Sequence, residues 1–258
     1  MKKTFFLWLL IAAAFAANSQ GKTLYEVNFV KPKPGMRSTF EAKWKAHLAL
    51  FHKTDDKRTV YEVVSGPHNG EYHIVEGPIS YADMDIDRPN GKEHGLDLEK
   101  NFSPYLEPNS MNATYRWDDT ASFNGKVEAD KFLVTVTHVK SNMITETIRE
   151  GRRGSLINAK LLQANNIPLR FSVNVYTQIW SGSDPVRVSI RNLKDGFKEL
   201  ETNYYGPDTT PPNAFRDAYI KDYGYDAWDA RQKVLDNNAN VESREVFIMK
   251  LRKDLSSE

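Results

Sequence analysis

Hydrophobic and polar positions near the beginning of the chain follow first a strand period and then a helix period. Residues 24–30 alternate, with apolar and aromatic side chains on one face and Glu26 and Asn28 on the other. A turn at Pro34-Gly35 interrupts this alternation, and residues 37–51 then repeat apolar positions at helical spacing. A half-polar strand followed by an amphipathic helix predicts the opening of a two-layer α+β unit.

Further alternations complete a first half at residues 21–120. A turn signal at Gly66-Pro67 separates two strand patterns, Gly77-Pro78 ends the second of them, and Ser80 is placed to cap a short helix. The elements predicted after the first helix are strands at 58–65 and 71–76, a helix at 93–102 and a strand at 111–117. The order β-α-β-β-α-β is that of a ferredoxin-like unit.

The same order of patterns begins again after a polar linker at residues 121–130. The helix predicted there is expected to bury a face with Ile144, Ile148, Leu156 and Leu162. The predicted elements are strands at 131–139, 169–180, 186–190 and 241–251 and helices at 142–163, 193–202 and 214–235. Residues 131–258 therefore predict a second ferredoxin-like half in tandem with the first, and one larger α+β domain is the alternative.

Residues 1–20 have the three parts of a secretory signal peptide. Lys2 and Lys3 precede an apolar run that is shorter than the roughly 20 residues needed to span a bilayer, and small residues follow it. Cleavage is expected near Ala16 or Ser19. The chain has no cysteine, which excludes a lipid anchor at the end of the signal. We therefore expect an exported protein, in the bacterial periplasm or secreted, without a membrane anchor.

Composition excludes several other classes. Apolar residues make up 40% of the chain and aromatic residues 12%, which is enough for a packed core. The net charge is +1 and basic runs are absent from the sequence, which argues against nucleic-acid binding. The lack of cysteine rules out disulfides, thiolate metal sites and cysteine nucleophiles. Nucleophile-elbow and phosphate-loop motifs are also missing, so acyl transfer and nucleotide chemistry are not expected.

The segment LYEVNFVKPKPGMRSTFEAKWKAHL, residues 24–48, resembles the opening of dimeric α/β-barrel proteins, a superfamily that includes antibiotic-biosynthesis-monooxygenase, NIPSNAP and haem-degrading groups. The similarity lies in the first strand, the Pro34-Gly35 turn and the Phe40 and Trp44 positions of the helix. This resemblance implies that two βαββαβ units pair their antiparallel sheets into a barrel around a central cavity. The protein would then be a monomeric pseudo-dimer or a homodimer.

The barrel that the resemblance implies directs attention to polar strand faces. Amides, hydroxyls and an arginine along several strands would suit a small polar or anionic ligand in the cavity. The candidate ligand-binding residues are Glu26, Asn28, Thr135, Thr137, Asn174, Tyr176, Gln178 and Arg187. The alternative is that these side chains form a solvated face or an interface between sheets. Catalytic residues cannot be assigned from the sequence.

Histidines supply the candidates for metal or haem chemistry. His47 and His52 are separated by five positions, whereas a metal site on one helix needs four, so we expect no metal site. Haem-degrading members of the resembled superfamily use an Asn, a Trp and a His. Asn28, Trp44 and one of His47, His52 and His73 supply these residue types without matching position by position. No cofactor is predicted, and haem is the alternative.

Three functions remain open. The first is an exported barrel that binds a small polar or anionic molecule between its halves. The second is an oxidoreductase of the monooxygenase or haem-degrading type, and the third is an envelope interaction protein without a ligand site. An open lumen with an inward-facing His or Arg would favour the first two. A lumen plugged by side chains and an exposed apolar patch on the helices would favour the third.

Overall fold

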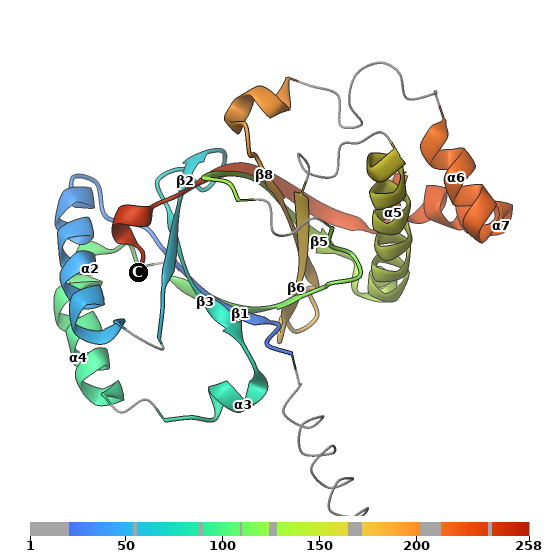
Figure 1. Cartoon of the computed structure of the whole chain (residues 1–258). Helices are drawn as coiled ribbons and strands as arrows, with labels where there is room; N and C mark the ends of the chain where they lie inside the picture. Colours follow the sequence, from blue (N-terminus) through green and yellow to red (C-terminus); the bar gives the residue numbers. More distant parts are fainter. Residues whose placement is uncertain are drawn as a thin grey trace, which may run out of the picture.

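A computed structural model describes residues 21–53, 56–87, 90–108, 110–123, 128–164, 172–201, 213–236 and 239–257. The predicted signal peptide, residues 1–20, lies outside the described residues. Figure 1 shows the strands as a ring, with helices outside it. The strands are β1 Leu24–Val30, β2 Thr59–Ser65, β3 Tyr72–Ile79, β4 Met111–Trp117, β5 Lys131–Val139, β6 Ser172–Ile179, β7 Val186–Asn192 and β8 Val241–Leu251.

The strands form a closed antiparallel barrel in the order β1-β3-β2-β8-β5-β7-β6-β4. Strands from residues 24–117 are adjacent to one another, and so are those from residues 131–251. Two seams join the groups, where β2 pairs with β8 and β4 pairs with β6. Closure leaves no strand edge exposed in this sheet. The predicted α+β class and the barrel are confirmed.

Helices cover the barrel on opposite sides (Figure 1). The helices are α2 Arg37–Phe51, α3 Tyr81–Met84, α4 Gly91–Asn101, α5 Ile144–Ala164, α6 Ala214–Tyr223 and α7 Tyr225–Arg231. Short turns of 3-10 helix are η1 Ser103–Tyr105, η2 Ser141–Met143, η3 Gly196–Leu200 and η5 Lys253–Leu255, and Gln232–Asp236 is a π-helical turn. The described part of the chain contains no helix with the length and apolar character needed to cross a membrane.

The α2 side of the barrel has an aromatic core. Phe40 and Trp44 are buried and pack with Phe102, which follows α4, and with Tyr72 of β3. The Trp44 indole Nε1 donates to the carbonyl oxygen of Leu255 at 2.7 Å, which fixes the end of the chain beneath α2. The helical spacing seen in the sequence therefore identifies the buried face of α2.

The predicted face of α5 is right only in part, since Leu162 is buried as expected and Ile144 and Ile148 are half-buried. Leu156 is 45% exposed, whereas Glu150, Gly154 and Ile157 are buried. The reason is that α6 packs beside α5 and places Tyr219 against the Glu150 carboxylate, so a polar stripe of the helix is enclosed.

Smaller differences concern element ends. β3 continues through Gly77-Pro78 to Ile79, because β2 no longer pairs there and Pro78 needs no donor on that side. The first residues of the predicted linker belong to the fold: Ala121 is fully buried and Phe123 pairs with Val173. The helix predicted at 193–202 is only η3. The Ser80 cap of α3 is present as a capping box.

Candidate functional site: the barrel lumen

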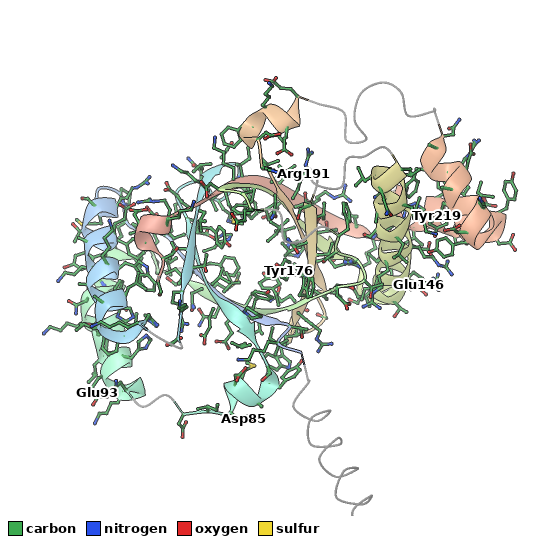
Figure 2. All side chains as sticks on the ribbon, viewed as in Figure 1. Asp85, Glu93, Glu146, Tyr176, Arg191 and Tyr219 are labelled. Atoms are coloured by element: carbon green, nitrogen blue, oxygen red, sulfur yellow. The ribbon has the colours of Figure 1, made fainter. Side chains whose placement is uncertain are left out.

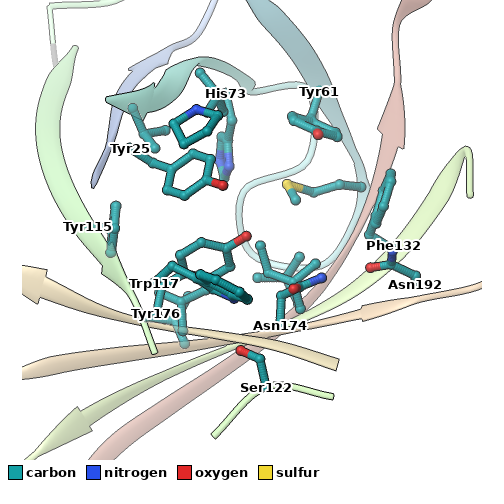
Figure 3. Close-up of a pocket in the computed structure, with 18 of the residues that line it drawn as sticks. Tyr25, Tyr61, His73, Tyr115, Trp117, Ser122, Phe132, Asn174, Tyr176 and Asn192 are labelled. Atoms are coloured by element: carbon teal, nitrogen blue, oxygen red, sulfur yellow. The ribbon is translucent and has the colours of Figure 1, made fainter. Parts of the chain in front are cut away.

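The barrel encloses a cavity of about 750 Å³ (Figure 3). Side chains alternate between the two faces of each strand, so residues Tyr25, Val27 and Phe29 of β1 face inward together. Most of the lining is aromatic or branched aliphatic. The aromatic lining residues are Tyr25, Phe29, Tyr61, His73, Tyr115, Trp117, Phe123, Phe132, Tyr176 and Phe247. A cavity of this size is within the range of small-molecule sites, roughly 300–1,000 Å³.

The predicted ligand residues are divided between two places. Asn174 and Tyr176 of β6 line the cavity. Glu26, Asn28 and Gln178 instead line a smaller pocket of about 210 Å³ beside Trp180. For β1 the expected orientation was therefore reversed, because its aromatic face and not its polar face is turned to the lumen.

Thr135, Thr137 and Arg187 also do not line the cavity. On β5 the inward positions are Val134 and Val136, so the threonines lie on the outer face. Arg187 pairs with Thr137 on the neighbouring strand and lies under α5, where its Nη1 is 3.5 Å from the Thr147 carbonyl oxygen. The prediction that this arginine meets an anionic ligand in the lumen is corrected.

Four tyrosines supply hydroxyl groups to a lining that also includes the polar residues Lys22, Asp119, Ser122, Asn174 and Asn192. Tyr25, Tyr61, Tyr115 and Tyr176 line it from four different strands, and their hydroxyls have no hydrogen-bond partner among the described residues. Figure 2 shows Tyr176 within the ring of strands. Burial raises the pKa of Tyr61 and of Tyr115 to about 12, and it raises the pKa of Tyr25 and Tyr176 as well. All four are therefore neutral hydrogen-bond donors at neutral pH.

Two further side chains of the lining, Trp117 and Asn174, carry polar groups that have no partner among the described residues. The buried Trp117 Nε1 makes no hydrogen bond, and the Asn174 amide has none among the described residues. A buried donor without a partner costs about 1–3 kcal/mol. Trp117 Nε1 has almost no accessible surface, so a ligand in the cavity does not meet it, whereas the acceptors of a ligand can meet the tyrosine hydroxyls and the Asn174 amide. The lining suits an uncharged aromatic molecule with oxygen substituents.

A chain of imidazoles and carboxylates leads from the lumen to the surface. The His73 Nε2 lies 3.0 Å from Glu71 Oε1, and the other carboxylate oxygen of Glu71 lies 3.3 Å from His68 Nδ1. The His68 Nε2 in turn contacts Glu245 at 2.7 Å. Burial lowers the pKa of His73, while Glu71 acts in the opposite direction. A neutral His73 that donates from Nε2 to Glu71 keeps a free lone pair on Nδ1.

The residue types of the haem-degrading groups do not converge here. Asn28 lies in the small outer pocket, Trp44 lies in the core beneath α2, and His73 lines the lumen. The Nε2 of His73 is already bound to Glu71. Lys22 is the basic side chain of the described lining, whereas haem carries two carboxylates that need partners. These residues fit haem poorly.

Outside the barrel, the structure brings three histidines together. The Nε2 atoms of His47, His52 and His94 lie 3.1–3.2 Å from one another. The five-residue spacing of His47 and His52 did not predict this contact, because α2 ends at Phe51. His52 is therefore the C-cap of the helix and turns back toward His47. These three side chains could hold a metal ion.

The fold is shared with solved structures. An anthrone oxidase-like protein superposes with a TM-score of 0.53 at 13% identity, over 90% of this chain and 92% of that one. A candidate monooxygenase of Lactobacillus acidophilus NCFM gives 0.50 at 11% identity, over 91% and 96%. A chlorite dismutase variant from Candidatus Nitrospira defluvii, in complex with cyanide, gives 0.51 at 8% identity, over 92% and 93%.

These similarities show the fold. The neighbours are dimeric α+β barrels of the antibiotic-biosynthesis-monooxygenase and chlorite-dismutase kind, which is the fold that the resemblance of residues 24–48 implies. No family model matches the sequence, and the search of curated proteins finds no match. At such low identities the function has to be argued from the residues of the lumen.

Proposed function

We propose that this protein is an oxidoreductase of the monooxygenase type that oxidises an uncharged aromatic small molecule inside the barrel. The observation that supports this most is the aromatic lumen, in which four tyrosine hydroxyls and the Asn174 amide have no hydrogen-bond partner among the described residues. Fold neighbours named as an anthrone oxidase-like protein and a candidate monooxygenase support the same class. The open lumen lined by His73 argues against an interaction protein without a ligand site.

The reaction that fits this lining needs no electrons from the protein. An activated CH2 group between aromatic rings reacts with O2 to give a ketone and water, so that the substrate supplies all the electrons that reduce oxygen. One oxygen atom forms the new C=O bond, and the other leaves as water with the two hydrogens of the carbon. When the CH2 carbon loses a proton, negative charge forms on the carbonyl oxygen that is conjugated with it in a substrate such as anthrone. Tyrosine hydroxyls around the substrate would donate to this oxygen and stabilise the charge.

His73 is the base in this proposal. Its Nδ1 accepts the proton from carbon, and Glu71 holds the ring through Nε2 and stabilises the imidazolium that forms. The contacts from Glu71 to His68 and from His68 to Glu245 offer the proton a way to the surface, where His68 and Glu245 are each 37% exposed. Glu71 and His68 are positioning residues, since neither lines the cavity.

The test uses anthrone as the probe, with the full chain. We expect saturable quenching of tyrosine and tryptophan fluorescence, and consumption of one O2 for each ketone formed. His73→Gln should lower kcat by a factor of about 10² or more with little change in KM. Tyr176→Phe should raise KM about 2- to 10-fold, the loss of one hydrogen bond. His138→Gln is the matched control and should change neither value, because His138 lies near the end of β5, is partly exposed and does not line the cavity.

The possible outcomes distinguish among the functions that the sequence left open. Binding without O2 consumption would indicate that the barrel only binds its ligand and does not oxidise it. A saturable Soret change on addition of haem, lost in His73→Ala, would replace it by a haem-linked oxidoreductase. No binding of anthrone or related aromatic ketones by the full chain would overturn the proposed substrate class.

We also infer that the chain is a tandem of two similar halves and that it is exported. Each half has the order β-α-β-β-α-β, and its four strands are contiguous in the barrel, which supports two ferredoxin-like units and a pseudo-dimer within one chain. The apolar segment at residues 1–20 supports export. Mass spectrometry of the mature protein, with a first residue after Ala16 or Ser19, would test that inference.

A further inference from the structure

We propose that His47, His52 and His94 bind one divalent transition-metal ion of the zinc class, at a site outside the barrel and independent of the lumen. The site joins the C-terminal end of α2 to α4. It goes beyond the proposed oxidation, because none of its ligands lines the cavity.

The distances between the ligand atoms match a metal site. The Nε2 of His47 lies 3.1 Å from that of His52 and 3.1 Å from that of His94, and the third separation is 3.2 Å. Zinc binds imidazole nitrogen at about 2.0–2.1 Å in tetrahedral geometry, which separates two ligand nitrogens by roughly 3.3 Å. The three nitrogens therefore already form one triangular face of such a site.

Hydrogen bonds at the opposite ring nitrogens decide the tautomers. The His47 Nδ1 lies 2.7 Å from Asp97 Oδ2, and the His52 Nδ1 lies 3.0 Å from the Asp56 carbonyl oxygen. Both oxygens accept, so each Nδ1 carries the proton and each Nε2 presents a lone pair. Two lone pairs facing each other at 3.1 Å repel, whereas a cation between them would bind both. A carboxylate or carbonyl behind the ligand is the usual arrangement around metal-binding histidines.

The surroundings favour a site that stabilises structure. His47 and His52 are almost fully buried, and the ring of Trp44 stacks on His47 with centroids 5.3 Å apart. Phe51 and Phe102 lie at the edges of the cluster. Three histidine ligands leave one position of a tetrahedral ion for water. No cavity residue of the lumen reaches this position, so the ion would hold the two helices together rather than meet the substrate.

The experiment measures zinc binding by the full chain after removal of metal with a chelator. We expect isothermal titration with zinc chloride to give one ion per chain, and cobalt(II) in its place to give the visible absorption of a four-coordinate ion. His94→Ala, at the half-buried ligand, should weaken binding by a factor of at least about 10², and Asp97→Asn by about 10- to 100-fold. Zinc should raise the Tm of the wild-type chain and leave that of His94→Ala unchanged.

Two control variants distinguish this site from the others in the chain. His138→Ala removes a partly exposed histidine of β5, and His73→Gln alters the lumen. Both variants should bind zinc as tightly as the wild-type chain. Circular dichroism of metal-free His94→Ala checks that the variant folds. Unchanged zinc affinity in folded His94→Ala would overturn the site, and so would equal loss of binding in His138→Ala. Neither result bears on anthrone oxidation, which has its own readout.

Discussion

The two helical layers of this barrel are built from different chemistry. Beneath α2 and α4 the contacts are aromatic: Phe40, Trp44 and Phe102 pack on one another and on the barrel strands. Beneath α5 the buried groups are charged, with Glu150 fully enclosed and Arg187 facing Asp118 at 3.8 Å. Figure 2 shows Tyr219 in this second layer, beside α5.

Glycines make the second arrangement possible. Gly151 and Gly154 lie in α5 on the side of two guanidinium groups, and a Cβ at Gly154 would lie 2.8 Å from the Arg231 Nη1. The Arg231 guanidinium also lies over the rings of Phe215 and Tyr219, with 4.8 Å and 5.6 Å to the centroids. The charged side chains are thus enclosed by backbone and aromatic faces, which partly replace the water they lose.

The difference teaches that one barrel can be covered in two energetically distinct ways. Aromatic packing is stabilised by burial of apolar area, which has little directional requirement. A buried ion-pair layer depends on the presence of every partner, because an unpaired buried charge costs far more than a paired one gains. The two layers should therefore respond to different kinds of substitution.

The largest effect is expected from Trp44→Ala in the aromatic layer. Trp44 is 4% exposed, and its loss leaves a cavity and an unpaired Leu255 carbonyl, so we expect a loss of about 3–5 kcal/mol in the free energy of unfolding. Urea denaturation measures it. Leu50→Ala, on the exposed face of the same helix, is the control and should stay within about 0.5 kcal/mol. Equal losses in the two variants would mean that the aromatic layer is not the core of this half.

In the charged layer, Glu150→Ala should have a smaller but still substantial effect. The Tyr219 hydroxyl loses its acceptor, whereas Arg149 and Arg153 are partly exposed and can turn to water, so we expect a loss of about 1–3 kcal/mol. Glu150→Ala combined with Tyr219→Phe should cost less than the sum of the single changes. Additive losses in this double-mutant cycle would show that the two groups are not coupled.

Elements with a regular pattern could be predicted from the sequence. The strands at 111–117 and 241–251 have the predicted bounds, and the predicted Ser80 cap is present, with Asp83 completing it as a capping box. Local alternation and capping chemistry depend on neighbours in the chain, so one sequence contains them. The closed barrel was expected from the resemblance of residues 24–48, not from periodicity.

The site could be predicted only in part. One face of each strand lies under the helices and the other lines the lumen. The alternation of side chains along a strand therefore separates two faces but does not tell which of them faces inward. The tyrosines do not decide it either. Tyr25, Tyr61, Tyr115 and Tyr176 face inward, but Tyr72 of β3 packs on Phe40 beneath α2. The histidine cluster depends on the packing of α4 against α2, which no local pattern encodes.

Two glycine-to-alanine substitutions, one in each helical layer, compare how each layer accommodates one added Cβ atom. Gly154→Ala in α5 forces the Arg231 guanidinium to move and should destabilise the protein by about 1–3 kcal/mol. Gly95→Ala in α4 meets nothing within 4 Å and should stabilise it by about 0.5–1 kcal/mol, because alanine favours a helix. Thermal unfolding of both variants measures whether each substitution lowers or raises the stability. A stabilising Gly154→Ala would show that Arg231 does not need this space.

The smallest effect concerns the charged cluster around Glu41 in the aromatic layer. Arg252 donates to Glu41 at 2.8 Å, and this contact, with a hydrogen bond from Tyr72, lowers the pKa of the Glu41 carboxyl to about 2 although partial burial opposes it. Because the folded-state pKa lies below the usual value near 4.5, the carboxylate contributes stability above about pH 4.5 and loses it as the pH falls toward 2.

Glu41→Gln should therefore flatten the decline of unfolding free energy between about pH 4.5 and pH 2, measured by urea denaturation at several pH values. Arg252→Gln removes the main partner and should flatten the same window, and the double variant should add little. The effect is modest because Glu41 is partly exposed and water screens its charge. Identical slopes in wild-type protein and Glu41→Gln would assign the acid sensitivity elsewhere, with the carboxylates of the α5 layer as the next group to substitute.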